Sequence, residues 1–136
     1  MKLLIDTNVI LDALMHREPW ADSAGEVLLA VAEEKADGFV TASSFTDLYY
    51  ILRKHTKDDE QTRQTLLGLL AVINVLDVNG SDCEKAFELP LGDYEDALQA
   101  SCAKRHRVDH IVTRDEKHYE GSPVKIISPK DILKKL

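Results

Sequence analysis

The sequence has few of the features that define several large protein classes. It contains only two cysteines, Cys83 and Cys102, and they form no CxxC pair, which excludes a disulfide framework and a cysteine-based zinc site. A reducing cytoplasm is the expected compartment. The longest apolar stretch, Leu66–Ile73, is far shorter than the ~20 residues of a membrane span. We therefore expect neither a signal peptide nor contact with a membrane.

Repeats, low-complexity segments and linkers rich in Pro, Gly or Ser are also absent. The 136 residues fit one domain, which we expect to cover residues 1–136. Hydrophobic residues make up 44% of the chain and charged residues 30%, an ordinary globular balance that argues against disorder. A chain of this length buries enough surface to fold without disulfides or metals.

Positive charge is in short supply. The chain has 17 Lys and Arg against 24 Asp and Glu, which gives a formal net charge of −7. Sequence-independent binding to nucleic acid depends on Lys and Arg, so a DNA-coating role is disfavoured. A nuclease remains possible, because a divalent cation held by carboxylates attracts phosphate.

Short apolar segments alternate with longer helical patterns. Strands are predicted at Lys2–Ile5, Phe39–Ala42, Ile73–Val78, His110–Thr113 and Val124–Ile127. Helices are predicted at Thr7–Met15, Ala21–Lys35, Ser44–Leu52, Asp58–Ala71, Asp82–Leu89, Asp93–His106 and Ser128–Leu136. This alternation predicts a three-layer α/β/α fold with a central parallel sheet of about five strands. On the fourth helix we expect one buried face with Leu66, Leu67 and Leu70.

Acidic side chains recur where such a sheet binds its ligands, beyond the carboxyl ends of the strands. Asp6 follows the first strand and Asp115 the fourth. Asp47 lies in the first turn of the helix after the second strand. Asp93 and Asp96 lie in the first turn of the helix before the fourth strand. If these elements converge, the carboxylates share one pocket.

A pocket of several carboxylates is costly, because like charges repel and burial adds a desolvation penalty. Divalent cations relieve that cost, and hard oxygen ligands favour Mg²⁺ or Mn²⁺. Two such ions can activate a water molecule and stabilise the leaving oxygen of a phosphodiester. The acidic pattern therefore points to metal-assisted hydrolysis.

Each acid also has a simpler structural explanation. Asp6 could cap the first helix, and Asp47 ends a capping-box pattern that starts at Ser44. Asp93 is a suitable N-cap, and we prefer that interpretation for it. Asp96 suits the positive end of a helix dipole, but the small residues after it favour a functional role. Capping explains the acids singly and does not explain why they recur at the ends of strands.

Four segments carry a family resemblance. MKLLIDTNVIL at 1–11, ASSFTDL at 42–48, DYEDALQA at 93–100 and IVTRD at 111–115 resemble, in family order, the acidic motifs of the PIN-domain nucleases. Together the motifs span nearly the whole chain. Many bacterial members of that family are VapC-like toxins that cleave RNA, dimerise and are silenced by a partner protein.

The resemblance implies a role for each matching residue. Asp6, Asp96 and Asp115 would bind Mg²⁺ or Mn²⁺, and Asp47 would join them as a fourth catalytic acid in a position that is usually Glu. Polar groups around them would orient the carboxylates or the water: Asn8, Thr113 and Asp93. Arg114 and Lys117, which lie close to Asp115 in the sequence, are candidates for binding the substrate phosphate.

The expected function is that of a metal-dependent endoribonuclease, the toxin of a type II toxin–antitoxin system, with RNA as substrate, a cognate antitoxin as partner and a homodimer as the assembly. The alternative is a non-catalytic or regulatory PIN-fold binding module, which the departure at Asp47 suggests. A phosphatase of the haloacid-dehalogenase type needs Asp where Asn8 stands. A receiver domain needs an acidic pair that the opening segment lacks. Both rank low.

Overall fold

Five parallel strands form the centre of the computed structural model, which describes residues 1–136. The strand order is β3-β2-β1-β4-β5, so β1 lies in the middle with β2 on one side and β4 on the other. The bounds are Lys2–Ile5 for β1, Asp37–Thr41 for β2, Asn74–Leu76 for β3, His110–Val112 for β4 and Lys125–Ile127 for β5. All five predicted strands are present.

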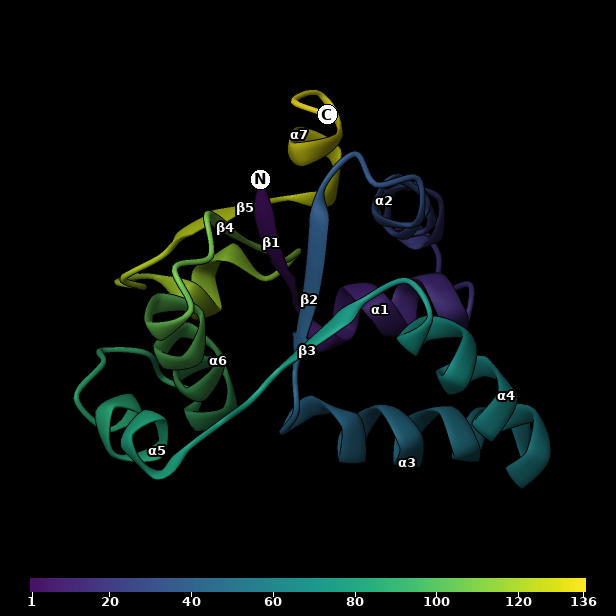
Figure 1. Cartoon of the computed structure of the whole chain (residues 1–136), viewed down its shortest axis with the longest axis horizontal. Helices are drawn as coiled ribbons and strands as arrows, with labels where there is room; N and C mark the ends of the chain where they lie inside the picture. The colour runs from purple at the N-terminus through teal and green to yellow at the C-terminus, as the bar shows by residue number, and fades with distance from the viewer.

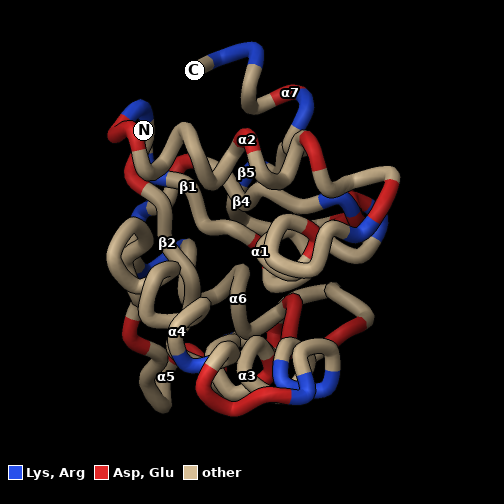
Figure 2. The backbone as a smooth tube through the Cα atoms, turned by 90° about the vertical axis from the view of Figure 1, so that its right-hand side faces the viewer, with Lys and Arg blue, Asp and Glu red and all other residues tan.

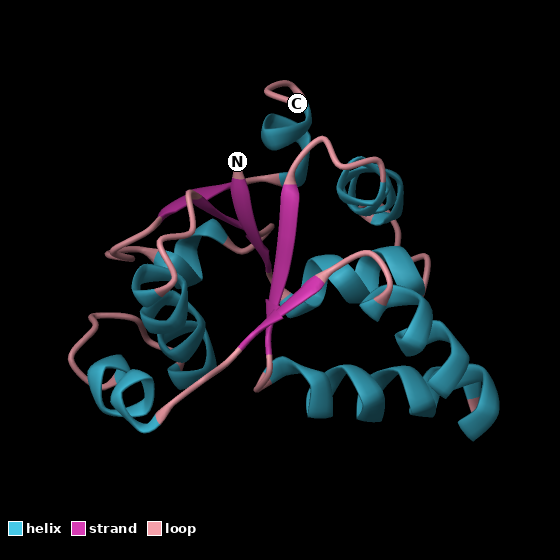
Figure 3. Ribbon diagram, viewed as in Figure 1, coloured by secondary structure: helices cyan, strands magenta, loops and turns pink.

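Helices cover both faces of this sheet (Figures 1 and 3). Helices α1 to α4 lie on one side of the strands, and α5 and α6 lie on the other (Figure 1). Their bounds are Thr7–Leu14 for α1, Ala21–Ala32 for α2, Ser44–Thr56 for α3, Asp59–Leu70 for α4, Gly80–Ala86 for α5, Tyr94–Arg105 for α6 and Pro129–Leu133 for the terminal α7. A short 3-10 helix, η1, spans Glu116–Tyr119. The predicted three-layer α/β/α architecture is confirmed.

The central strand β1 is buried on both faces, as expected inside a parallel sheet. Side chains alternate along a strand, so Leu3 and Ile5 pack into the core beneath α1 to α4. Leu4 points the other way and packs into the core beneath α6. The two hydrophobic cores therefore meet at β1 and fix the position of its carboxyl end.

Helix α4 corrects one expectation about the core. Leu66 is buried as predicted, but Leu69 is its buried partner, while Leu67 and Leu70 are 54% and 44% exposed. Four leucines within five residues supply an apolar side chain to nearly every face of the helix, so periodicity could not identify the buried one. The longest helix, α3, has 13 residues, and none of the helices could span a membrane.

Candidate active site

The carboxyl ends of β1 and β4 define the site. These strands pair in parallel with Ile5 opposite Val112, and the Asp6 amide donates to the Val112 carbonyl at 3.0 Å. Asp6 and Thr113 therefore leave the sheet side by side. The strand β2, on the other side of β1, leads into α3, which carries Asp47.

Asp6 stands at the N-cap position of α1, but hydrogen bonds from other elements hold its carboxylate. Its side chain is buried, with 4% exposure, and makes no capping bond to α1. Thr113 Oγ1 donates to Oδ2 at 2.9 Å, and Gln99 Nε2 donates to Oδ1 at 3.2 Å. Burial raises the pKa of Asp6, although these two hydrogen bonds oppose the rise. The carboxylate is therefore fixed in place at an energetic cost.

Four carboxylates line one cavity of about 270 Å³, which we call the acid hollow. Its lining is Asp6, Thr7, Asn8, Asp47, Ile51, Glu95, Asp96 and Gln99. Burial, and then the charges of Asp6 and Asp93, raise the pKa of Asp96 to about 6. Burial, and then the charges of Asp47 and Asp93, raise the pKa of Glu95. The hollow thus resists holding all of its acids ionised at once.

Asp115 lies at the edge of the acid hollow. Its backbone amide donates to Thr113 Oγ1 at 3.0 Å, and Asn8 Nδ2 donates to Asp115 Oδ2 at 3.4 Å. Its charge contributes to the raised pKa of Asp6. Of the four acids predicted to be catalytic, the structure thus places three in the hollow, and Asn8 and Thr113 connect the fourth, Asp115, to it.

Asp93 has the capping role that the sequence suggested. Its Oδ1 accepts from the Asp96 amide at 3.1 Å and starts α6. Its charge also contributes to the raised pKa of Asp96.

Asp47 does not have the capping-box role that the sequence suggested. The residue before α3 makes no side-chain capping bond, and Asp47 lines the acid hollow instead.

The capping role of Asp93 can be tested directly. Asp93→Ala is expected to lower the free energy of unfolding by about 1 kcal/mol, since it removes the acceptor for the first turn of α6. Asp93→Asn keeps an acceptor in the same place and should stay close to the wild type in urea unfolding. Equal losses in the two variants would contradict a capping role.

The donors of the acid hollow fit a hard divalent cation. Carboxylate and amide oxygens are the ligands that Mg²⁺ and Mn²⁺ prefer, and no thiol or imidazole lines the cavity. No group of three or more acidic, His or Cys side chains is arranged to enclose one ion. Mg²⁺ commonly binds through one or two carboxylates and keeps several waters, so an open site of this kind suits it.

Three side chains of the site were not foreseen from the sequence: Glu95, Gln99 and Tyr119. Gln99 Nε2 donates to the Tyr119 hydroxyl at 3.2 Å as well as to Asp6, and its Oε1 is buried without a partner. Gln99 lies one helical turn after Asp96, and that spacing is a usable signal. Tyr119 is 1% exposed and lies on η1, where no periodic pattern marks it.

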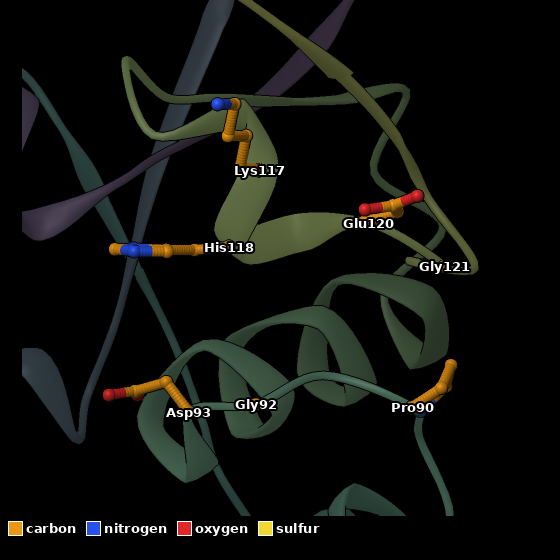
Figure 4. A pocket seen from close by; sticks show the side chains of 7 residues that line it. All are labelled: Pro90, Gly92, Asp93, Lys117, His118, Glu120 and Gly121. Atoms are coloured by element: carbon orange, nitrogen blue, oxygen red, sulfur yellow. The ribbon is translucent and has the colours of Figure 1, made fainter.

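The two predicted phosphate-binding residues lie outside the acid hollow. Arg114 is paired with Asp12, with Nε 2.7 Å from Oδ2. Lys117 lines a separate pocket of about 580 Å³ with Asp93 and His118. Figure 4 shows the His118 ring and the Asp93 carboxylate projecting to the same side of this pocket, while the Lys117 side chain extends away from both. His118 Nδ1 lies 4.0 Å from Asp96 Oδ2, so the pocket adjoins the hollow.

Fold and site together define an α/β/α domain whose acids gather at the carboxyl edge of a parallel sheet. A family model described as "PIN domain" matches residues 2–117, most of the chain. The chain belongs to the PIN domain family, as the four sequence motifs indicated. A search of the curated proteins found no match.

Solved structures of toxin–antitoxin proteins share this fold. VapBC2 from Rickettsia felis, bound to a promoter DNA fragment, matches with a TM-score of 0.72 and 22% identity over 94% of this chain and 98% of that one. FitAcB from Neisseria gonorrhoeae matches with a TM-score of 0.70 and 21% identity over 94% and 98%. The sarcin–ricin-loop-cleaving toxin VapC20 from Mycobacterium tuberculosis matches with a TM-score of 0.68 and 11% identity over 90% and 98%.

Proposed function

We propose that the chain is a metal-dependent endoribonuclease that hydrolyses RNA phosphodiester bonds with Mg²⁺ or Mn²⁺. The observation that carries the proposal is the placement of Asp6 and Asp96 in one hollow, where burial and the charge of Asp6 raise the pKa of Asp96. A fold that retains such a costly arrangement gains from it when a cation binds. Membership in the PIN domain family agrees with this chemistry.

In the proposed site, Asp6, Asp96 and Asp115 would share the cation, one or two of them by direct contact and the rest through its water ligands. A cation held there would supply an activated water and neutralise charge on the phosphate. Thr113 and Gln99 fix the orientation of Asp6 through the hydrogen bonds described above. Asn8 does the same for Asp115. Glu95, whose pKa is raised by burial and by the charge of Asp47, can take up or release a proton at the wall of the hollow.

The structural neighbours bear on the biological role and partners of this chain. They include a toxin–antitoxin complex from Klebsiella pneumoniae and a toxin that cleaves the sarcin–ricin loop. We therefore propose that this chain is the toxin of a type II pair, with a cognate antitoxin and a homodimeric assembly. Exposed apolar side chains on α3 and α4, among them Tyr50, Leu67 and Leu70, support a protein-covered surface.

The non-catalytic alternative rested on the Asp in place of Glu at position 47. Asp47 lines the hollow with Asp6, and Glu95 beside it supplies a second acid to that wall. The shorter side chain therefore does not leave that wall without an acid, and nothing in the geometry favours a binding module over an enzyme.

Metal binding gives the first test of the proposed site. Millimolar Mn²⁺ is expected to raise the melting temperature of the wild-type protein by several degrees, because a ligand at about 100 times its Kd stabilises by about 2.7 kcal/mol. The Asp6→Asn variant should show little of this shift, while Glu26→Gln, which removes an exposed acid from α2, should show all of it. A wild-type melting temperature indifferent to Mn²⁺ would argue against the metal site.

A further inference from the structure

A charged group next to the acid hollow has no part in the proposed reaction. Asp12 on α1 is buried, with 1% exposure, and pairs with two arginines. Arg17 Nε lies 2.8 Å from its Oδ1, and Arg114 Nε lies 2.7 Å from its Oδ2. One guanidinium is enough to neutralise this carboxylate, and the second, that of Arg114, also faces Asp115. Once a cation in the proposed site neutralises Asp115, one of the two guanidinium charges is left unbalanced. We call Arg17 and Arg114 the arginine rim.

The arginine rim is joined to the acid hollow through Asn8. Arg17 Nη2 donates to the Asn8 carbonyl at 3.1 Å and to Asn8 Oδ1 at 3.3 Å. Asn8 itself lines the hollow and donates to Asp115. Arg114 Nη1 lies 3.6 Å from Asp115 Oδ1. A ligand in the hollow would therefore lie beside these two guanidinium groups.

Arg17 keeps capacity for a further ligand, whereas all three guanidinium nitrogens of Arg114 face Asp12 or Asp115. Their side chains are 30% and 20% exposed, and the bonds of Arg17 use Nε and Nη2, which leaves the two N–H groups of Nη1. Elsewhere Lys and Arg lie in several separate parts of this acidic chain (Figure 2). Trp20 packs against the rim, with Arg114 Cζ 3.8 Å from its ring centroid. These contacts restrict the motion of the arginines, so that the free Nη1 of Arg17 is held in place to donate to an oxyanion.

We propose that the arginine rim binds the backbone phosphate next to the cleaved one in single-stranded RNA, and that Asp12 is the positioning residue that holds both arginines for it. This inference rests on the proposed ribonuclease function and names the part of the substrate that the acid hollow cannot bind. The carboxylates of the acid hollow repel every RNA phosphate that does not meet a cation. Binding of the neighbouring phosphates therefore needs fixed positive groups beside the hollow.

Trp20 provides a direct test, because it is the only tryptophan in the chain and touches the rim. The Asp96→Asn protein, impaired in cleavage, is mixed in Mg²⁺ with a fluorescently labelled single-stranded RNA oligonucleotide. Anisotropy of the label reports binding, and Trp20 emission reports where the RNA lies. We expect the two signals to change together across the titration, and inorganic phosphate at the same concentration to leave Trp20 emission nearly unchanged.

A pair of matched variants tests the charge itself. In the same background, Arg17→Ala is expected to weaken RNA binding about tenfold. It should also lower the slope of log affinity against log salt by about 0.7, the value for one lost phosphate contact on a single strand. Arg63→Ala removes the same charge from an exposed position on α4 and should change neither quantity.

Several results would overturn the inference. RNA that binds without changing Trp20 emission, inorganic phosphate that changes it as much as RNA does, or equal effects of Arg17→Ala and Arg63→Ala would each do so. The Trp20 measurement needs no change at the rim, so it decides even if Arg17→Ala fails to fold. If the wild type cleaves RNA but Trp20 emission does not change when RNA binds, only this inference is wrong. Absence of both cleavage and binding defeats the proposed function with it.

Discussion

Asp6→Asn and Asp96→Asn are each expected to lower RNA cleavage in saturating Mg²⁺ by about 10³-fold or more. Each replacement removes a negative charge that holds the cation, and a bound cation stabilises the transition state by several kcal/mol. The Asp6→Asn side chain can still accept from Thr113, so the local geometry should change little. Single-turnover cleavage of a labelled RNA by the purified proteins measures the effect.

The control for this prediction is Glu26→Gln, which removes one exposed acid far from the strand ends and should cleave like the wild type. If both carboxylates act through one cation, removing either of them already removes the benefit of that cation. The double variant should therefore cleave little more slowly than either single variant. Cleavage that persists in the Asp6→Asn/Asp96→Asn protein would show that the acid hollow is not the active site.

The same Asp96→Asn change should make the metal-free protein more stable, by about 2–3 kcal/mol at pH 7.5. Burial and the neighbouring acids raise the pKa of Asp96 from 3.8 to about 6. A pKa difference of about 1 between the folded and unfolded states changes the free energy of unfolding by about 1.4 kcal/mol. Because the folded pKa is the higher one, the neutral acid stabilises fully below pH 4, and that contribution is lost as the pH rises through 6. Asparagine stays neutral throughout and avoids the loss.

Urea unfolding in EDTA at pH 7.5 and pH 4.5 measures this difference. The gain from Asp96→Asn should be large at pH 7.5 and small at pH 4.5, whereas Glu26→Gln should show no such pH dependence. An Asp96→Asn protein that is no more stable than the wild type at pH 7.5 would refute the claim that ionised Asp96 destabilises the folded state. The two expected results together describe a residue that lowers stability and supports activity.

Much of the fold was predictable because local patterns determined it. Each strand is a short apolar run bounded by a turn, and their alternation with helices left a parallel sheet as the consistent arrangement. The ends of the elements were less predictable: α2 stops at Ala32 although helical spacing continues to Lys35. The leucines of α4 show the same limit, since only the packing partner decides which of them is buried.

The candidate site was predictable to the extent that topology brings strand ends together. Asp6, Asp47 and Asp96 line one hollow. Asp6 follows β1, Asp47 lies on the helix that follows β2, and Asp96 lies on the helix that precedes β4. Of the arginine rim, Arg114 was a phosphate-binding candidate from the sequence, but Arg17 and its link to Asp12 were not predictable, because both lie on α1 or in the loop after it. Pairing of Arg114 with Asp12 joins residues 102 positions apart, and neither residue carries a local signal of the other.

The central position of β1 also determines how the proposed active site can be disrupted by unfolding. The strand β1 pairs on both edges and packs on both faces, so we expect it to open only with the whole domain. Asp6 directly follows that strand, whereas fraying at β3, β5 or α7 would leave it in place. Partial denaturation therefore offers no route to silence this carboxylate, and a cell would have to cover it or degrade the whole molecule.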